Sequence, residues 1–239
     1  MQQEQILETL RYFLRMPLEA TPVLAHFVAL PNAQFHDFGG EERFVYIPAT
    51  RENAVLLVAH ADTVETTDYP TELLEDNDII RNADPEQILG ADDRAGCAMV
   101  SILGKMLGHG MLITDGEENG QVGARALVAQ CEAIADELQS QYQFMVEFDR
   151  RESRNFKCYD VGTDAFRAYL STKTGYRDDG RIAYTDICTL ARDICGVNLA
   201  TGFYNEHSTD EYLSKSDWFE TLELAIKWLG EDDLPRFQR

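Results

Sequence analysis

Histidine and carboxylate side chains recur in this sequence just after stretches of apolar residues. They fall in five separate segments: His60-Ala61-Asp62, Asp92-Asp93, Glu117-Glu118, Asp149 and Glu206-His207. A mixture of imidazole and carboxylate groups suits zinc, and manganese or cobalt are also compatible. Carboxylates gathered without compensation would repel one another unless cations lay among them. The residue types therefore predict a site for divalent metal ions, provided that the fold brings the five segments together.

The elements around these segments supply the reason why they should meet. Continuous apolar runs, typical of strands buried on both faces, lie at 54–59, 111–114, 144–148 and 197–201. Helix-periodic segments lie at 95–107, 122–138, 163–173 and 185–195. This alternation predicts a three-layer α/β/α fold with a mostly parallel central sheet. Ligands of such sheets bind beyond the carboxyl ends of the strands, so all five segments are expected at one edge.

The remaining segments are expected to surround this sheet. Further helices are predicted at 2–15, 18–29 and 216–229, and shorter strands at 35–38, 44–47 and 156–159. A turn at 75–78 separates two short strands that should lie outside the core layer.

Two metal ions fit the number of side chains. One ion is expected on His60 and Asp149, and the other on Glu118 and His207. Asp92 would bridge both, which gives each ion three protein ligands and an open position for a shared water. Two divalent ions carry four positive charges, which the three carboxylates and a bridging hydroxide would balance.

Two further carboxylates have expected roles beside the metals. Successive residues in extended backbone point to opposite sides, so Glu117 is expected to face the substrate cavity if Glu118 reaches a metal. Asp62 lies two residues after His60 and is expected to orient that imidazole.

The motifs together resemble the co-catalytic di-zinc exopeptidases of clan MH, which include peptidase T, leucyl-type and tetrahedral aminopeptidases, and aminoacylases. The resemblance spans residues 60–207, and the segment 89–96 looks most like peptidase T. It rests on His60-Ala61-Asp62, Gly90-Ala91-Asp92-Asp93-Arg94-Ala95-Gly96, Asp115-Gly116-Glu117-Glu118-Asn119-Gly120, Glu147-Phe148-Asp149-Arg150-Arg151 and Glu206-His207-Ser208-Thr209-Asp210-Glu211. It implies a phosphorylase/hydrolase-like zinc peptidase fold, the same ligand roles with Asp92 bridging, and Glu117 as general acid and base. It also implies a cis peptide between Asp92 and Asp93.

The chain departs from those relatives in having no room for a lid domain. Peptidase T-like enzymes and aminoacylases carry a lid between the positions matching Asp149 and His207, and the tetrahedral aminopeptidases carry one between those matching His60 and Asp92. These intervals hold 57 and 31 residues here, and the predicted strands and helices already fill them. We expect one catalytic domain over residues 1–239, without a lid or dimerisation domain.

Other polar residues are expected to be structural. The histidines outside the motifs, which we expect in the core or at the surface, are His26, His36 and His109. Tyr204 is expected to pack rather than to stabilise an oxyanion. Asp186 is expected to cap a helix rather than to bind metal. Arg94 is expected to pair with carboxylates of the acidic edge.

Composition narrows the class of protein. The 239 residues include 21 Lys and Arg against 42 Asp and Glu, for a net charge of −21. This charge disfavours nucleic acid or an anionic membrane as partner, and no apolar run is long enough for a membrane span. The amino terminus lacks the basic and apolar regions of a signal peptide, and five scattered cysteines fit reduced thiols. A cytoplasmic protein is therefore expected, with oligomeric state open.

These expectations favour a metallo-exopeptidase that hydrolyses a peptide or small amide with metal-activated water, most simply an aminopeptidase. Two alternatives stay open at this point. One is a deacylase or amidohydrolase acting on N-acyl amino acids or similar small amides. The other, from a different class, is a non-catalytic metal-binding module. The sequence does not indicate which side chain the substrate carries.

Overall fold

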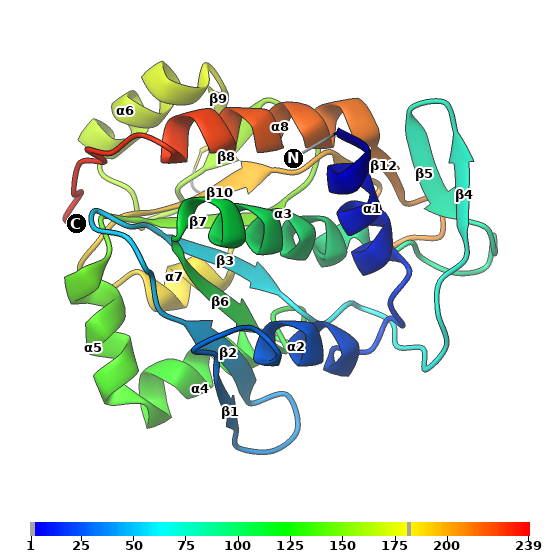
Figure 1. Ribbon diagram of the computed structural model, residues 1–239, viewed down its shortest axis with the longest axis horizontal. Coiled ribbons are helices and arrows are strands. Elements are labelled where there is room, and N and C mark those ends of the chain that lie inside the picture. Colours follow the sequence, from blue (N-terminus) through cyan, green and yellow to red (C-terminus); the bar gives the residue numbers. More distant parts are fainter. Residues whose placement is uncertain (1–2, 181–182) are drawn as a thin grey trace.

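The centre of the molecule is an eight-stranded sheet (Figure 1). The computed structural model describes residues 3–180 and 183–239. The strand order is β1-β2-β6-β3-β7-β10-β8-β9. The strands are β1 (Gln34–Asp37), β2 (Arg43–Ile47), β3 (Leu56–His60), β6 (Gly110–Thr114), β7 (Met145–Arg150), β8 (Asn155–Lys157), β9 (Arg177–Asp178) and β10 (Gly196–Ala200). The middle strands β6, β3, β7 and β10 are mutually parallel, as the apolar runs predict.

Helices cover both faces of this sheet (Figure 1). One face carries α1 (Gln3–Leu14), α2 (Thr21–Val28), α3 (Ala91–Leu107), α6 (Asp164–Thr174) and α8 (Lys215–Leu229). The other face carries α4 (Val122–Gln130), α5 (Glu132–Gln141) and α7 (Asp186–Leu190). The fold is thus the predicted three-layer α/β/α arrangement with a mostly parallel sheet.

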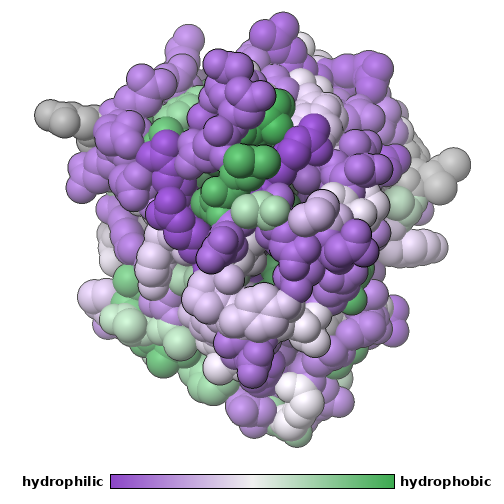
Figure 2. All heavy atoms as spheres, turned by 90° about the vertical axis from the view of Figure 1, so that its right-hand side faces the viewer, coloured by the Kyte–Doolittle hydropathy of each residue, from purple (hydrophilic) through white to green (hydrophobic). Residues whose placement is uncertain are grey.

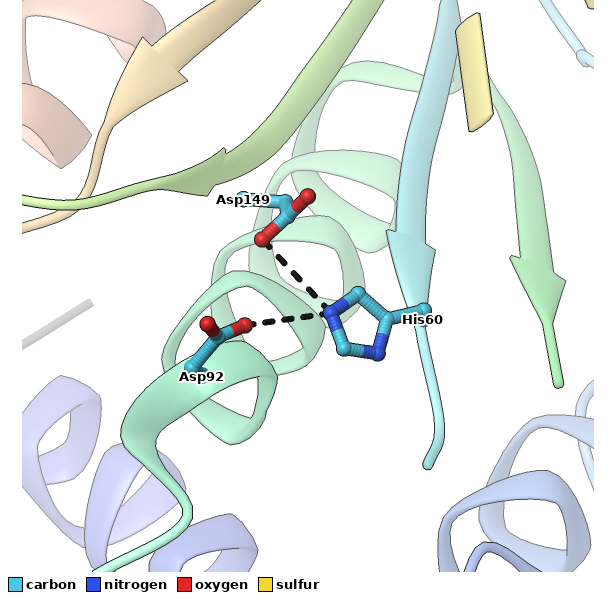
Figure 3. Close-up of side chains that lie close together, drawn as sticks. All are labelled: His60, Asp92 and Asp149. Atoms are coloured by element: carbon cyan, nitrogen blue, oxygen red, sulfur yellow. Dashed lines mark hydrogen bonds and ion pairs between the residues drawn. The ribbon is translucent and has the colours of Figure 1, made fainter. Parts of the chain in front are cut away.

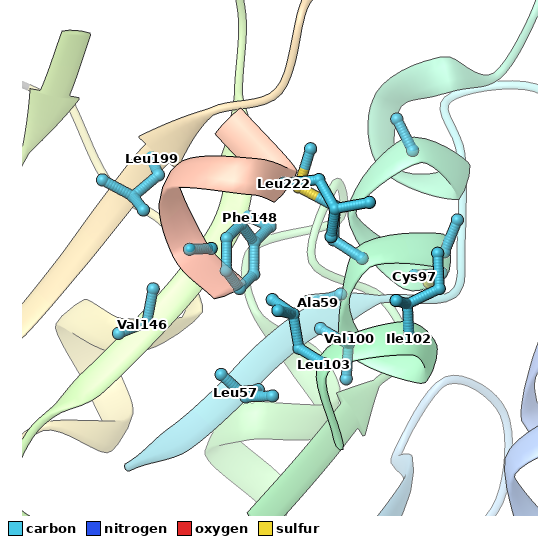
Figure 4. Packing of buried hydrophobic residues seen from close by; sticks show 14 of the residues in the cluster. Leu57, Ala59, Cys97, Val100, Ile102, Leu103, Val146, Phe148, Leu199 and Leu222 are labelled. Carbon is cyan, nitrogen blue, oxygen red and sulfur yellow. The ribbon is translucent and has the colours of Figure 1, made fainter. Parts of the chain in front are cut away.

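The buried strand β3 shows how one apolar run serves both layers. Leu57 and Ala59 point into the cluster that α3 and α8 cover, where they lie near Val100 and Leu222 (Figure 4). Leu56 and Val58 belong to the cluster on the opposite face. Successive strand residues alternate in direction, so a strand covered on both faces needs apolar residues at every position. This requirement explains the absence of alternation in the sequence of β3.

Glycine is required where α3 approaches the sheet. A Cβ atom on Gly96 would lie 1.9 Å from the backbone oxygen of Phe148 in β7. The beginning of α3 can therefore lie directly against the end of β7 only because position 96 has no side chain. This contact brings the amino terminus of α3 to the carboxyl edge of the sheet.

A second, four-stranded sheet lies at this side of the molecule, with the order β11-β12-β5-β4. Its strands are β4 (Leu73–Asp76), β5 (Ile79–Asn82), β11 (Phe203–Tyr204) and β12 (Tyr212–Ser214). The hairpin of β4 and β5 projects beyond the main sheet, as its polar turn predicts (Figure 1). The side of the molecule toward which β3 points is mostly hydrophilic, with apolar residues in smaller groups (Figure 2).

Two helix predictions need correction. The helix expected over 122–138 is two helices, because Cys131 has φ −125° and ψ 59°, which is not helical. The helix expected over 185–195 ends at Leu190. There the side-chain oxygen of Gln139 accepts hydrogen bonds from the backbone amides of Arg192 and Asp193, at 3.0 and 2.9 Å. These bonds satisfy the donors that a continued helix would have used, so the chain can turn into β10.

Two further features bear on the sequence-based expectations. None of the five cysteines, all of which lie among the described residues, takes part in a disulfide. Over residues 3–180 and 183–239, none of the helices has both the length and the apolar character that crossing a membrane requires.

Candidate metal centre

The structure brings five of the predicted residues together at the carboxyl edge of the main sheet. His60 is the last residue of β3, and Asp149 lies near the end of β7. Asp92 lies at the beginning of α3, where it and Asp93 have non-helical backbone angles. Glu118 follows β6, and His207 lies between β11 and β12. The five side chains form two groups of three that share Asp92, with ligand atoms in each group within 4.8 Å of one another.

The first group consists of His60, Asp92 and Asp149, which converge from β3, α3 and β7 (Figure 3). The Nε2 atom of His60 lies 3.1 Å from Oδ1 of Asp92 and 3.5 Å from Oδ1 of Asp149. Burial alone would lower the pKa of this imidazole, but the surrounding carboxylates, Asp62 foremost, outweigh it and raise the pKa.

The second group consists of Asp92, Glu118 and His207. The Nε2 atom of His207 lies 3.1 Å from Oδ2 of Asp92 and 2.8 Å from Oε1 of Glu118. Asp92 thus presents one oxygen to each group. These contacts, with Asp92 first and Glu118 second, raise the pKa of His207 to about 10.

This electrostatic pattern fits divalent metal binding. Hydrogen bonds from both imidazoles point at carboxylate oxygens, so each group stabilises positive charge at its centre. A metal ion can take the place of the proton between the same atoms, because metal binding uses the neutral imidazole and the ionised carboxylate. The donor set of nitrogen and oxygen suits zinc, manganese or cobalt.

Asp62 connects His60 with the segment that carries the two adjacent glutamates. The Nδ1 atom of His60 lies 3.1 Å from the backbone oxygen and 3.3 Å from Oδ1 of Asp62. The same carboxylate accepts hydrogen bonds from the backbone amides of Glu117 and Glu118, both at 3.1 Å. The contact with His60 agrees with the predicted orienting role, and the contact with the glutamates is additional.

Asp149 is held by residues that sequence reasoning did not select. The Thr185 hydroxyl donates to Oδ2 of Asp149 at 2.8 Å. The side chain of Asn198 on β10 accepts from the backbone amide of Asp149 and donates to its backbone oxygen, both at 2.9 Å. These contacts leave Oδ1 of Asp149 directed at His60 (Figure 3).

Asp92 is positioned by its own backbone and by Glu211. The peptide between Asp92 and Asp93 is cis, as the resemblance implies. The carboxylate of Asp93 accepts from the backbone amides of His60 and Gly96, at 3.1 and 3.0 Å. Glu211 is only 2% exposed and accepts from the amides of Gly90 and Asp92, at 2.7 and 3.1 Å. Sequence reasoning gave Glu211 no role, and its place four residues after His207 was the available signal.

Glu117 belongs to neither group of three. It lines a cavity of about 320 Å³ together with Asp92, Glu118, Asp149 and His207. Burial, followed by the nearby charge of Asp149, raises the pKa of Glu117 to about 9. A carboxyl group that faces the cavity without joining either group is placed to exchange protons with a bound molecule.

Two predictions near the centre are wrong. Arg94 donates to the backbone oxygens of Ala61, Pro17 and Glu19 rather than to carboxylates, because its side chain is buried beneath the preceding loops. Asp186 does not cap α7, since Thr185 is the N-cap residue. Asp186 is instead fully buried and accepts from the Thr114 hydroxyl, and it is a member of neither group of three.

The other structural expectations are confirmed. The ring of Tyr204 stacks on Tyr212 with centroids 4.9 Å apart, and its hydroxyl donates to Asp217 at 2.7 Å. His26 packs against Phe13, and His36 stacks on Phe44. The buried ring of His109 accepts from the Val55 amide at 3.2 Å and donates to the Leu229 oxygen at 3.0 Å. These histidines are therefore packing residues.

The fold is a three-layer α/β/α arrangement with two adjacent groups of possible metal ligands at the carboxyl edge of its sheet. A family model described as Peptidase family M28 matches residues 44–177, which is more than half of the chain. The chain belongs to peptidase family M28, whose members are metal-dependent peptidases. No curated protein sequence matches the chain.

Solved structures with the same fold include two peptidases and a cyclase. The aminopeptidase PepT from Bacillus cereus ATCC 10987 is 15% identical, with 96% of this chain and 98% of that chain covered and a TM-score of 0.67. The tripeptidase SAV1512 from Staphylococcus aureus subsp. aureus Mu50 has the same identity and coverage and a TM-score of 0.68. A glutaminyl cyclase from an Acidobacteriales bacterium is 13% identical, with 94% and 92% covered and a TM-score of 0.63. These likenesses show the fold.

Proposed function

We propose that this peptidase is a co-catalytic metalloaminopeptidase, which removes the first residue from peptides or cleaves small amino-acid amides. The observation that carries the proposal is the pair of three-residue groups that share Asp92. His60, Asp92 and Asp149 would hold one divalent ion, and Asp92, Glu118 and His207 would hold the other. Zinc is the first candidate, with manganese or cobalt as alternatives.

The ions would supply Lewis-acid activation of the scissile carbonyl and of water. The chain itself supplies the proton transfer. Glu117 faces the same cavity. With cations bound at the two neighbouring groups, the pKa of Glu117 would fall from about 9, so that its carboxylate could accept a proton from the attacking water and return it to the departing amine. Asp62 keeps the backbone of Glu117 and Glu118 in place through two hydrogen bonds. Loss of the Asp62 carboxylate would remove both bonds, and so affect the proposed base and a proposed ligand together.

The groups around the cavity favour a free amino terminus over an acylated one. Five carboxylates line the cavity: Asp92, Glu117, Glu118, Asp149 and Glu206. A protonated α-amine donates hydrogen bonds to carboxylates, and a neutral one can bind metal, whereas an acylated nitrogen does neither well. An aminopeptidase is therefore favoured over a deacylase of N-acyl amino acids. We further propose that residues 1–239 act as one catalytic domain without a lid, and that the protein works in the cytoplasm.

The experiment compares leucine amide with N-acetyl-leucine amide as substrates of the zinc-loaded protein. Acetylation is expected to lower kcat/KM by at least about 10²-fold, which corresponds to about 2.7 kcal/mol of transition-state binding. Faster turnover of the acetylated compound would favour the deacylase. Tight zinc binding without hydrolysis of either compound would favour a non-catalytic metal-binding module.

Anomalous diffraction from zinc-soaked crystals tests the ligand assignment separately. Two ions are expected, one on each group of three. A single ion in fully loaded crystals, or an Asp92 side chain that contacts neither ion, would contradict the assignment.

A further inference from the structure

We propose that an arginine-lined groove beside the metal-binding groups binds a carboxylate on the leaving segment of peptide substrates. The inference rests on the proposed aminopeptidase function and adds a substrate class to it. That class is peptides of three or more residues that carry an acidic side chain or a free carboxyl terminus beyond the cleaved bond. The argument starts from the turn 151–154, which connects β7 to β8 and follows the proposed ligand Asp149.

The arginine groove consists of two cavities that continue from the cavity of the metal-binding groups. A cavity of about 220 Å³ shares Arg151 and Glu206 with the metal cavity and adds Tyr204 to its wall. A second cavity, of about 360 Å³, shares Tyr204 with the first one and adds Arg154 and Arg177. The shared residues place the three cavities next to one another, so a peptide that leaves the metal cavity can continue along the groove.

The reach of a peptide from the metal cavity is limited by the chain itself. The Nη1 atom of Arg151 lies 2.6 Å from Oε1 of Glu206, the residue before His207. Arg154 is five residues after Asp149, so their Cα atoms are no more than about 18 Å apart. An extended peptide advances about 3.3–3.6 Å per residue. A carboxylate between about the third and the sixth residue of a substrate is therefore within reach of Arg154.

Arg154 and Arg177 are neighbours at the far end of the groove. Strand β9 pairs with β8 in parallel, and the Arg177 amide donates to the backbone oxygen of Arg154 at 3.0 Å. Both side chains are 70% exposed. Two guanidinium groups at the wall of one cavity are suited to hold a carboxylate, because each presents N–H donors in a planar fork.

Both arginines have donors left for a ligand. Among the described residues, the Nε atom of Arg154 donates to Glu220 at 3.0 Å, and its two terminal nitrogens make no hydrogen bond. The side chain of Arg177 makes no hydrogen bond within the same part of the chain, and its ion pair with Asp179 is 3.6 Å long. Arg150 binds the other oxygen of Asp179. Arg177 is therefore the less engaged of the two cations.

The charge of the groove differs from that of the whole molecule. The net charge of −21 repels acidic peptides, so a local group of cations has a clear effect on where they bind. Three arginines line the groove against two carboxylates, those of Glu152 and Glu206. Ions in the metal cavity would offset the carboxylates there as well. An anionic leaving segment would then find favourable charge along this path.

The kinetic experiment uses two peptide series on the zinc-loaded protein. One is Leu-Ala-Ala-Ala-Ala-Ala-NH₂ with a single Glu at each position from two to six, compared with Gln at the same position. The other compares free acids with amides for Leu followed by two to five Ala. At least one peptide with a carboxylate at residues three to six should exceed its uncharged partner about three- to tenfold in kcat/KM at low ionic strength. About 0.5 M salt should reduce this preference below about twofold, because exposed charges are screened.

The two series separate the two sources of the carboxylate. A preference in the first series assigns an acidic side chain, and one in the second assigns the carboxyl terminus. Either supports the inference if the arginine variants remove it. Equal rates for charged and uncharged peptides in both series, or a preference confined to Glu at position two, would overturn the inference.

The test variant is Arg154→Gln, Arg177→Gln, which should bring charged and uncharged peptides within about 1.5-fold of each other. The rates for the uncharged peptides should change less than about twofold. Arg177→Gln alone removes no hydrogen bond and should lower the preference while it folds like the wild type. The matched control is Arg15→Gln, Arg125→Gln, because both are exposed arginines outside the groove and the change in net charge is the same. An equal loss of preference in the control would contradict a local site.

Calorimetry separates this inference from the proposed chemistry. Zinc-loaded Glu117→Gln, in which turnover should be slow, is titrated with each Glu peptide and its Gln partner. Tighter binding of a Glu peptide, lost when Arg154→Gln and Arg177→Gln are added, supports the groove even if the wild type hydrolyses none of the peptides. Rapid hydrolysis of every peptide without a charge preference rejects the groove and leaves the aminopeptidase proposal intact.

Discussion

Glu117 and Glu118 are adjacent in the chain, yet the structure gives them different environments. Glu118 lies 2.8 Å from His207 in a group of three, and Glu117 faces the cavity outside both groups. Glu117→Gln should therefore lower kcat by roughly 10² to 10⁴ through loss of proton transfer while both metals stay bound. Kinetics on leucine amide, with metal content measured by elemental analysis, check this.

Glu118→Gln is the matched control for that prediction, because it makes the same change one residue away. It should reduce the bound metal, since the neutral amide is a weaker ligand than the carboxylate. Near-native turnover in Glu117→Gln would show that the base is another residue.

Glu211 is expected to determine zinc affinity without touching the metal. Its carboxylate accepts the amides of Gly90 and Asp92, and so fixes the backbone that presents the shared ligand. Glu211→Gln should weaken zinc binding about 10- to 100-fold. The reason is that the NH₂ group of the glutamine side chain would face one of the two backbone N–H groups, which are also donors. Competition with a chromophoric chelator measures the affinity.

Excess zinc separates a positioning role from a general loss of structure in this variant. If Glu211 only positions Asp92, saturating zinc should restore most of the hydrolysis of leucine amide. Glu223→Gln on the exposed face of α8 is the control and should bind zinc like the wild type. Unchanged zinc affinity in Glu211→Gln would contradict the positioning role.

Sequence patterns predicted the site residues that directly follow core strands, and they missed those whose role depends on the path of the chain. His60 and Glu118 follow apolar runs, so the topology of a parallel sheet places them at one edge. Glu211 and Thr185 reach the site from loops whose course no local pattern specifies. Asp186 was misread for the same reason, because its burial beside Thr114 arises from the packing of α7 under the sheet.

At the scale of elements, the central strands were predictable and the periphery was not. Doubly covered strands need long apolar runs, which makes β3 and β6 conspicuous in the sequence. The small sheet joins β11 and β12 to the hairpin of β4 and β5, which lies more than 120 residues earlier in the chain. In addition, β11 has two residues and β12 has three, and such short strands carry too little periodicity to be recognised in a sequence. The break at Cys131 has no proline or glycine to indicate it.

His109 connects two elements and makes their packing sensitive to acid. Its ring accepts from Val55, just before β3, and donates to Leu229 at the end of α8. Burial lowers its pKa from 6.5 to about 4. The unfolded chain thus binds a proton more readily, so the contribution of His109 is fully present above pH 6.5 and is lost as the pH falls toward 4. The shift corresponds to about 3 kcal/mol.

Urea unfolding of the wild type and His109→Gln at pH 7.5 and 4.5 tests this contribution. The substitution is expected to destabilise the protein at pH 7.5 and to reduce the loss of unfolding free energy between the two pH values by about 2 kcal/mol or more. Comparing each protein with itself at two pH values cancels the cost of the substitution. An identical pH dependence in both proteins would contradict the assignment of the shift to His109.

At the scale of the whole molecule, metal binding should couple to stability because the two groups join segments from distant parts of the chain. The first ion would connect β3 to α3 and β7, and the second would connect α3 to the segment after β6 and to the loop that carries His207. Each ion would also offset part of the net charge of −21. Binding to the folded state alone stabilises by about 2.7 kcal/mol per site when free metal is 100 times Kd. For a chain of this length that is roughly 5–11 °C in Tm per site.

The variant that separates the two sites is His207→Ala, which removes a ligand from only the second group. Zinc should still raise the Tm of this variant, by about half of the wild-type shift, because the group of His60, Asp92 and Asp149 is intact. His36→Ala on the edge strand β1 is the matched control and should keep the full shift. Calorimetric scans with zinc and with a chelator give the numbers. A wild-type Tm that zinc does not move would reject the proposed centre, and an equal shift in His207→Ala would show that His207 binds no metal.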